Sequence, residues 1–271
     1  MLAEVYAVVK KKAQIYLLKY LNRPTLPKHI AFIMDGNRRF ALQRQLKKEA
    51  GHSFGFEKLQ QVLEWCMALD IKELSVYAFS VDNFKREKSE VQVLMDLCVD
   101  KMKELLKEES LLHEYKVKVN IVGEKALLPK YVLDVCDELE RKTQSYSNKI
   151  LNICMPYSST LEMLNSLKQM EKGNELAADL EEYEESENNF NNAESELESR
   201  FKQGLYLKTK LDLVIRTSGE HRLSDFMMYQ VCEGAVIEFS SLLWPEFSFM
   251  EYFFILVKYQ NRKINWFGLY A

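Results

Sequence analysis

The chain has 271 residues, of which 47% are hydrophobic and 28% charged, and its formal net charge is −3. A chain of this length and composition can bury a core of its own, so collagen-like, disordered and disulfide-dense classes are excluded. The small negative charge argues against a dedicated nucleic-acid-binding protein, although residues 1–50 carry eleven Lys and Arg against three acids, which predicts an anion site in the N-terminal third.

The first segment, residues 2–21, combines apolar positions with Lys10, Lys11, Lys12 and Lys19. This pattern is typical of an amphipathic helix, and its apolar run is far shorter than the roughly 20 residues that span a bilayer. Two interpretations stay open: a helix packed on the domain, or a helix that lies on a membrane surface or under an apolar substrate mouth. Prolines end the segment, so we expect this helix within residues 1–26 and one catalytic domain over 27–271.

Short apolar runs then alternate with helical patterns. The predicted strands are 30–34, 74–79, 117–122, 150–155, 211–215 and 236–239, and the predicted helices are about 54–69, 89–108, 131–142, 160–170, 224–233 and 249–259. This order predicts an α/β fold with a mostly parallel central sheet covered by helices on both faces. Residues 171–198 break the pattern because they are acidic and poor in aliphatic side chains, which predicts a mobile surface insertion within the domain.

Polar side chains follow three of the predicted strands. Residues 35–39 follow the first strand, 80–86 the second and 216–224 the fifth, and together they supply carboxylates, arginines, hydroxyls and glycines. Ligand sites of parallel sheets lie beyond the carboxyl ends of the strands. Arginines and helix N-terminal amides bind phosphate oxygens, and a nearby carboxylate can hold Mg²⁺. A solvated loop explains any one segment, but three converging loops predict a polyphosphate site with a metal. Walker A and GxGxxG motifs are absent from the sequence.

Three segments resemble signatures of the cis-prenyltransferases, the undecaprenyl and dehydrodolichyl diphosphate synthases. They are HIAFIMDGNRRF at 29–40, YAFSVDNFKR at 77–86 and IRTSGEHRLSDF at 215–226, with LWPEF at 243–247 behind them. The resemblance implies that family's fold and its reaction, in which isopentenyl diphosphate is joined to an allylic diphosphate such as farnesyl diphosphate with a new cis double bond. The triplets at 37–39 and 84–86 are similar to the eukaryotic dehydrodolichyl branch, whose long-chain product serves dolichol synthesis and protein glycosylation.

The resemblance also implies a role for each matched residue. Asp35 is the essential carboxylate and the Mg²⁺ ligand, and Asn83 matches the residue usually assigned to proton removal, although an amide is a weak base and we expect it to position the substrate. The allylic diphosphate is expected at Gly36, Asn37, Arg38, Arg39 and His52, the reacting end at Ser80, Asp82, Asn83, Phe84 and Arg86, and isopentenyl diphosphate at Arg216, Arg222 and Ser224. Phe40, Lys48, Val81 and Leu223 complete the expected substrate-binding set.

The sequence departs from the family pattern at several positions. Asp82 replaces a more usual glutamate, Lys48 replaces an arginine, and Ala235 stands where bacterial members carry a second metal-ligating glutamate. The C-terminal Arg-x-Gly is also missing, because Trp266 stands where its arginine should be. In two-subunit eukaryotic enzymes a Nogo-B-receptor-like subunit supplies that motif, so the resemblance implies a heteromer at the cytosolic face of the endoplasmic reticulum or a lipid droplet.

Several alternatives and expectations accompany this interpretation. A non-catalytic accessory subunit of the same fold would lack Asp35 and much of the arginine loop, which this chain retains, and a nucleic-acid-binding module leaves Asp35 unexplained. The predicted helix 89–108 can line a hydrocarbon tunnel or simply pack in the core. The aromatic side chains between 244 and 254 are numerous enough to form the core of a subunit interface.

Overall fold

The computed structural model describes residues 12–268 apart from 15, 19, 22, 108–110 and 173–186, and of the side chains it leaves out 172, 187–194 and 263–268. Its sheet has six strands in the order β3-β4-β2-β1-β5-β6, and all the pairings are parallel. The strands are β1 (His29–Ile33), β2 (Glu73–Tyr77), β3 (Val117–Val122), β4 (Lys149–Cys154), β5 (Leu213–Arg216) and β6 (Val236–Phe239). The predicted α/β class with a parallel central sheet is confirmed.

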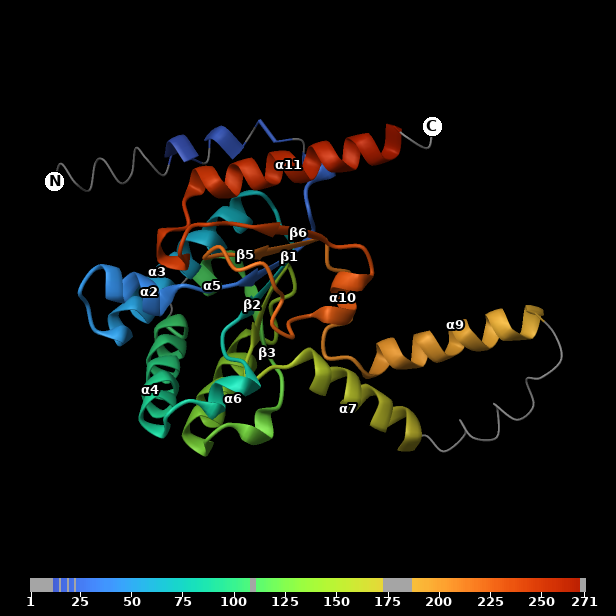
Figure 1. Cartoon of the computed structure of the whole chain (residues 1–271), viewed down its shortest axis with the longest axis horizontal. Helices are drawn as coiled ribbons and strands as arrows, with labels where there is room; N and C mark the ends of the chain where they lie inside the picture. Colours follow the sequence, from blue (N-terminus) through green and yellow to red (C-terminus); the bar gives the residue numbers. More distant parts are fainter. Residues whose placement is uncertain are drawn as a thin grey trace.

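Helices cover the sheet on both faces (Figure 1). The α-helices are α2 (Asn37–Gln43), α3 (Lys48–Ala68), α4 (Lys88–Leu105), α5 (Leu111–Tyr115), α6 (Lys130–Thr143), α7 (Ser159–Lys172), α9 (Glu187–Gly204), α10 (Met228–Cys232) and α11 (Phe249–Gly268). Four 3-10 turns join them: η1 (Arg23–Thr25), η2 (Val81–Lys85), η3 (Lys125–Leu127) and η4 (Trp244–Glu246). Because side chains alternate along a strand, Phe32 packs with the α3 and α11 layer, whereas Ala31 and Ile33 pack with Phe226 on the opposite face.

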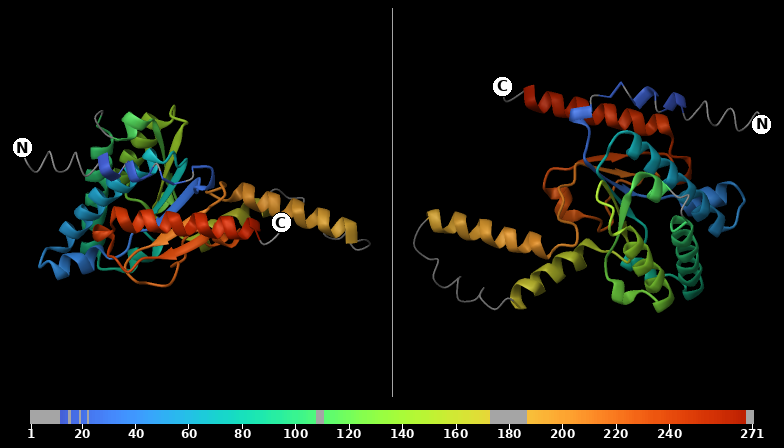
Figure 2. Two further views of the ribbon diagram at one scale, coloured as in Figure 1. Left: turned by 90° about the horizontal axis from the view of Figure 1, so that it is seen from above. Right: turned by 180° about the vertical axis from the view of Figure 1, so that it is seen from behind.

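The second half of the predicted insertion is helical, which its composition did not predict. Helix α9 begins at Glu187, so residues 187–198 are helical, whereas residues 173–186 lie outside the described part of the chain. The acidic side chains are stabilised there by cations one turn later, with Glu196 paired to Arg200 at 3.3 Å and Glu198 to Lys202 at 2.9 Å. Helices α7 and α9 lie side by side and project from the sheet (Figures 1 and 2).

The described residues between 12 and 21 run alongside α11 (Figures 1 and 2). Residues 12–14 and 16–18 are helical, and most of the predicted helix 2–21 lies outside the described residues. Leu18 and Leu21 are buried in the core, which favours a segment packed on the domain, while Tyr16 and Tyr20 remain exposed. Of the helices in the described part, none is both long and apolar enough to cross a membrane.

The aromatic side chains of 244–254 mostly belong to the core of the domain. Trp244, Phe249 and Tyr252 are buried against α3, where Trp65 stacks on Tyr252 with ring centroids 5.7 Å apart. Only Phe254 in this group is largely exposed. The expectation that these aromatics form the core of a subunit interface is therefore wrong for its buried members, because α11 uses them to cover the sheet.

Candidate active site

The predicted site segments meet at one edge of the sheet. Strands β2, β1 and β5 are neighbours, and their parallel register brings the residues that follow each strand to the same edge. The chain continues from β1 to β2 on one side and later adds β5 on the other, so the strand order reverses next to β1. Ligand crevices of open parallel sheets form at such a reversal.

Asp35 lies at the centre of this edge. Its Oδ2 accepts a hydrogen bond from Arg216 Nη2 at 2.9 Å, and its Oδ1 accepts one from the Gly36 amide at 2.6 Å and lies 3.5 Å from Arg39 Nη2. The Arg216 side chain is only 4% exposed. Partial burial opposes ionisation of Asp35, but the Arg216 hydrogen bond and the charges of Arg216 and Arg39 lower its pKa below the usual value. We call these four residues the Asp35 cluster.

The loop after β5 holds this cluster in place. Thr217 Oγ1 accepts a hydrogen bond from the Asp35 amide at 3.0 Å, and Arg39 Nη2 donates to Ser218 Oγ at 2.5 Å. Arg216 Nη1 donates to Ser224 Oγ at 2.7 Å. Ser218 and Ser224 have positive φ angles of 81° and 51°, a conformation that non-glycine residues rarely adopt. Such strain is typical of ligand-binding loops that the surrounding structure holds in place.

Gly36 makes the turn between β1 and α2. Its φ is +104°, and a Cβ at this position would lie 2.9 Å from Leu243 Cδ2 and 3.1 Å from Leu243 Cα. The following residue, Trp244, donates its backbone N–H to the Asp35 carbonyl oxygen at 2.9 Å and its indole N–H to the Gly55 carbonyl at 2.7 Å. The LWPEF segment therefore supports the Asp35 loop from behind, and glycine is required at position 36.

A second group of charges surrounds Glu90, in the first turn of α4. Its Oε1 lies 2.9 Å from Arg86 Nη1 and 3.3 Å from Arg38 Nη1, and its Oε2 lies 3.9 Å from Lys48 Nζ. We call these four residues the Glu90 cluster. His52 is mostly buried beside it, and burial, then the charges of Arg86 and Arg38, lowers the His52 pKa to about 4. The imidazole is therefore neutral at pH 7.

The two clusters contain six of the predicted polar site residues, and the others make different contacts. Asn83 Oδ1 accepts a hydrogen bond from Arg86 Nη2 at 2.9 Å, which ties Asn83 to the Glu90 cluster. The exposed Asp82 carboxylate instead pairs with Lys85 at 2.7 Å. The Arg222 side chain is exposed and pairs with Glu220, whereas the Arg222 backbone carbonyl oxygen accepts a hydrogen bond from Arg216 Nη1.

The remaining predicted residues support the site through packing and backbone contacts. Asn37 faces α3 closely enough that a Cβ on Gly55 would lie 2.3 Å from Asn37 Oδ1. Phe40 packs edge-on against Phe54, and Phe84 packs against Phe79. Ser80 Oγ accepts a hydrogen bond from the Asp82 amide, and the Val81 amide donates one to the Tyr157 carbonyl. Leu223 packs against the core face that contains Phe226.

Sequence reasoning missed Glu90 and Tyr77. Tyr77 Oη donates to the Ser224 carbonyl at 3.2 Å, and its ring stacks on Phe226 with centroids 4.5 Å apart, so it positions the loop that carries Ser224. Glu90 follows Arg86 by four residues, and that spacing alone suggests an ion pair across the start of a helix. It does not reveal that Arg38 and Lys48 reach the same carboxylate.

A metal at this edge would depend on Asp35. Among the described residues, no group of three or more His, Cys, Asp or Glu side chains could hold a metal ion. Mg²⁺, however, commonly uses one or two carboxylates together with substrate phosphates, and the ionised Asp35 carboxylate fits that pattern. Glu233 pairs with Lys202 at 2.7 Å and Glu238 with Arg262 at 2.9 Å, so neither takes the place of the glutamate that Ala235 replaces.

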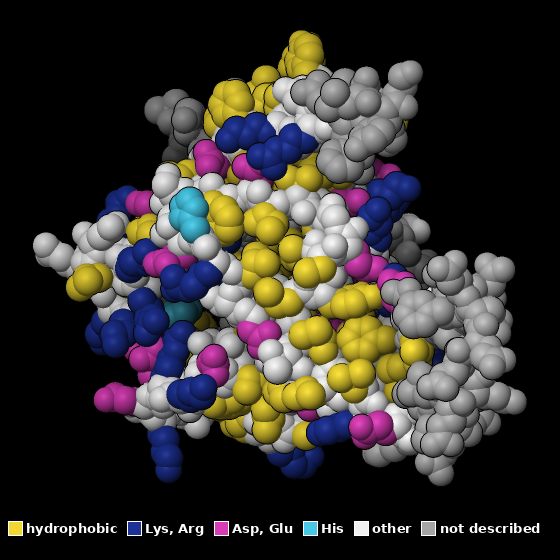
Figure 3. Space-filling model, turned by 45° about the vertical axis from the view of Figure 1, so that its right-hand side comes forward, with side chains coloured by type: hydrophobic (Ala, Val, Ile, Leu, Met, Phe, Trp, Pro, Cys, Tyr) yellow, Lys and Arg dark blue, Asp and Glu magenta, His cyan; other side chains and the backbone are white. Residues whose placement is uncertain are grey.

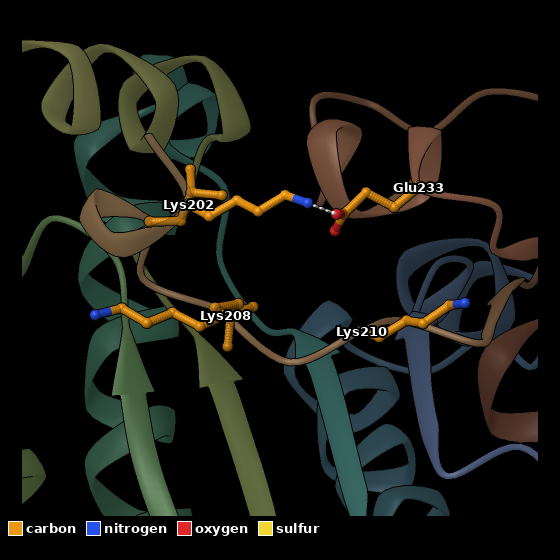
Figure 4. Close-up of a pocket in the computed structure, with 6 residues that line it drawn as sticks. Lys202, Lys208, Lys210 and Glu233 are labelled. Carbon is orange, nitrogen blue, oxygen red and sulfur yellow. Dashed lines mark ion pairs between the residues drawn. The ribbon is translucent and has the colours of Figure 1, made fainter. Parts of the chain in front are cut away.

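A separate pocket of about 210 Å³ lies between the end of α9 and α10 (Figure 4). It is lined by Lys202, Lys208, Lys210 and Glu233 together with two leucines. Lys202 is already paired with Glu233 and Glu198, and Figure 4 shows the Lys208 and Lys210 side chains pointing in opposite directions. These lysines do not converge on one point, so the strand-end edge remains the better candidate for a phosphate site.

Comparisons with known proteins identify the family of the chain. Residues 33–267 match the family model described as "Putative undecaprenyl diphosphate synthase". The chain is a member of this cis-prenyltransferase family. It is 39% identical over 254 residues to a tritrans,polycis-undecaprenyl-diphosphate synthase (geranylgeranyl-diphosphate specific) of Pyrococcus abyssi, covering 92% of this chain and 89% of that protein. It is also 39% identical over 237 residues to a dehydrodolichyl diphosphate synthase complex subunit of Homo sapiens, covering 87% of this chain and 67% of that protein.

A solved structure supports the same assignment. Lavandulyl diphosphate synthase of Lavandula x intermedia, in complex with dimethylallyl diphosphate, superposes with a TM-score of 0.71 at 27% identity, covering 88% of this chain and 96% of that chain. The expected fold, family and enzyme class are therefore confirmed: this cis-prenyltransferase catalyses cis-prenyl chain elongation. Its metal, its partner and the roles of individual residues remain predictions.

Proposed function

We propose that this cis-prenyltransferase joins isopentenyl diphosphate to farnesyl diphosphate and repeats the step to give long-chain dehydrodolichyl diphosphate for dolichol synthesis and protein glycosylation. The observation that carries the proposal is the presence of two cation-rich clusters, around Asp35 and around Glu90, at one edge of the sheet. The condensation needs two diphosphates held side by side so that their carbon ends meet. The Glu90 cluster and Arg39 lie where the allylic diphosphate is expected, and Arg216, Arg222 and Ser224 lie where isopentenyl diphosphate is expected, with Asp35 paired to both Arg39 and Arg216.

The Asp35 cluster acts where pyrophosphate leaves the allylic substrate. Negative charge develops on the leaving group at this step, so fixed cations lower the barrier. Asp35 is ionised at neutral pH and orients the Arg39 and Arg216 guanidinium groups. Asp35 would hold Mg²⁺ together with the substrate, and the ion would further neutralise the negative charge of the leaving group.

The other site residues position the second substrate. Arg216, Arg222 and Ser224 hold isopentenyl diphosphate, and Tyr77 fixes their loop. The side-chain oxygen of Asn83 accepts a hydrogen bond from Arg86, so the NH₂ group of Asn83 is available to orient the reacting end of the substrate. After the new C–C bond forms, the proton that is lost passes to diphosphate or water, because an amide is too weak a base.

Helix α4 contributes the proposed hydrocarbon path. Met95, Val99 and Met102 on this helix are buried in the core, whereas Val91 and Leu94 are only partly buried. Each of the two interpretations of this helix therefore applies to one part of it. The part that carries Met95, Val99 and Met102 packs in the core, and the part before it, next to Glu90, is available to line the path of an allylic chain. The name of the Pyrococcus relative makes geranylgeranyl diphosphate the alternative allylic substrate.

We propose that residues 27–271 form the catalytic subunit of a heteromer with a Nogo-B-receptor-like subunit that supplies the missing C-terminal arginine. The name of the human relative, a complex subunit, supports this. Exposed Leu164 and Leu167 on α7 and Met228 on α10 offer an apolar surface for a partner. Figure 3 brings that side forward and shows a broad apolar area, with basic and acidic side chains interleaved toward α2 and α4.

The described residues of 12–26 and α11 lie on the side that we propose faces the membrane. Tyr16, Tyr20, Met250 and Phe254 are exposed on these elements, and tyrosine suits a boundary between apolar and aqueous phases. A product with a long hydrocarbon chain needs a bilayer nearby. We therefore place the enzyme peripherally at the cytosolic face of the endoplasmic reticulum or on a lipid droplet.

Incorporation of radiolabelled isopentenyl diphosphate tests the proposal. The chain is assayed with farnesyl diphosphate, Mg²⁺ and liposomes, alone and with the candidate partner. Long polyprenyl products that require the partner are expected. No incorporation in either mixture would refute the catalytic role and favour the accessory subunit, whereas full activity alone would refute only the heteromer.

A further inference from the structure

Glu90 lies where the three cations of its cluster converge. Arg38 comes from α2, Lys48 from the start of α3 and Arg86 from the segment after η2, and each reaches the same carboxylate within 4.0 Å. Arg86 is four residues before Glu90, but Arg38 and Lys48 are far from it in sequence, so their convergence on this carboxylate results from the fold and not from local helix geometry. The Glu90 side chain is 22% exposed, so a ligand from solution can reach it.

The cations outnumber the carboxylate. Glu90 supplies one negative charge to three positive ones, and the neighbouring His52 is neutral at pH 7, so the cluster keeps a net positive charge. Arg38, Lys48 and Arg86 are also side chains for which the family resemblance implies a role in substrate binding. A carboxylate and a phosphate oxygen accept hydrogen bonds from guanidinium groups in the same manner, so they compete for the same donors.

We propose that Glu90 occupies the diphosphate position of this cluster in the ligand-free enzyme and is displaced when the allylic diphosphate binds. The inference rests on the proposed function and adds a positioning residue to it. Glu90 keeps three mutually repelling cations in place before the substrate arrives. It also pairs with them again when pyrophosphate leaves, so it weakens binding of both the substrate and this product.

The test measures the Kd of inorganic pyrophosphate by calorimetry for the wild-type protein and Glu90→Gln. Removing the competing charge should tighten pyrophosphate binding about threefold to tenfold, as expected for the loss of partly exposed ion pairs. Glu90→Asp retains the charge and should restore a Kd near that of the wild type. Glu246→Gln is the matched control, because Glu246 pairs with Arg44 at 3.5 Å, just past the end of the helix that carries Arg38 and outside the cluster. The Kd of pyrophosphate for this variant should stay unchanged.

Steady-state kinetics give an independent readout. Glu90→Gln should lower the KM for farnesyl diphosphate and also lower kcat, because pyrophosphate is released more slowly. An unchanged or weaker pyrophosphate affinity in Glu90→Gln would overturn the inference. The proposed function is judged separately. A wild-type protein that binds pyrophosphate but never incorporates isopentenyl diphosphate would refute the proposed function, whereas the ratio of the pyrophosphate Kd values of wild type and Glu90→Gln would still test the inference about Glu90.

A crystal structure of the wild-type protein with pyrophosphate keeps the test valid if Glu90→Gln fails to fold. Arg38 and Lys48 are then expected to contact the ligand and to lie beyond about 4 Å from Glu90. A bound pyrophosphate elsewhere, with the Glu90 ion pairs intact, would refute displacement.

Discussion

Replacement of Asp35 by asparagine tests the centre of the site without changing its shape. The amide keeps the size of the side chain but removes the charge that holds Arg216 at 2.9 Å and Arg39 at 3.5 Å. It also removes the proposed ligand of Mg²⁺. We expect kcat to fall at least about 100-fold, which corresponds to about 2.7 kcal/mol and is similar to the loss of one donor from an oxyanion hole.

The same substitution affects stability much less than catalysis. Arg216 loses its counterion but keeps hydrogen bonds to Ser224 and to the Arg222 carbonyl, so the free energy of unfolding should fall by about 2 kcal/mol. Asp70→Asn is the matched control, because Asp70 is a carboxylate paired with a nearly buried lysine, Lys149, at the opposite edge of the sheet. It should cost about 1 kcal/mol of stability and leave turnover unchanged.

The assay is single-turnover incorporation of labelled isopentenyl diphosphate at saturating farnesyl diphosphate, with urea unfolding measured in parallel. A folded Asp35→Asn protein that retains more than about a tenth of wild-type activity, roughly 1.4 kcal/mol in the barrier, would refute the role given to Asp35. Equal activity losses in Asp35→Asn and Asp70→Asn would show that the defect is general instability.

Two further substitutions separate the subsites and the turn. Arg222→Ala should raise the KM for isopentenyl diphosphate and leave the KM for farnesyl diphosphate unchanged. Arg216→Ala should also lower kcat, because Arg216 holds Asp35. Steady-state kinetics with each substrate varied in turn would contradict this prediction if the two variants behaved alike. Gly36→Ala should lower the free energy of unfolding by about 3 kcal/mol, because alanine disfavours the positive φ and its Cβ would contact Leu243. Gly219→Ala should cost only about 1 kcal/mol, because an added Cβ meets no described atom within 4 Å there. Urea unfolding of the two variants checks the difference.

The sequence was sufficient to place the strands and the edge that carries the site. Uninterrupted apolar runs such as residues 30–33 are typical of strands buried on both faces, and the residues after such strands share an edge in a parallel sheet. Charge patterning was a weaker guide. It predicted a mobile segment at 187–198, where i,i+4 ion pairs and packing against α7 stabilise a helix.

The direction of side chains could not be predicted. Asp82 and Arg222 belong to motif segments, yet both carry exposed ion pairs with neighbours in sequence, Lys85 and Glu220. Glu90 belongs to no motif, yet three cations contact it. Local spacing reports which residues are near in the chain, but such convergence depends on how α2, α3 and α4 pack, which the sequence pattern does not contain.

His52 gives a test of the local electrostatic field that needs no substrate. Burial, then Arg86 and Arg38, lowers its pKa from 6.5 to about 4. Between these pH values the unfolded chain takes up a proton that the folded protein does not, so this contribution to stability is complete above pH 6.5 and is lost as the pH falls toward 4. His52→Gln lacks the titration. The difference in unfolding free energy between the wild type and this variant, measured in urea, should therefore narrow by about 3 kcal/mol from pH 7 to pH 4. A difference that stays constant would mean that neither burial nor the charges of Arg86 and Arg38 lower the pKa of His52, and would contradict the assignment of a neutral imidazole beside the Glu90 cluster.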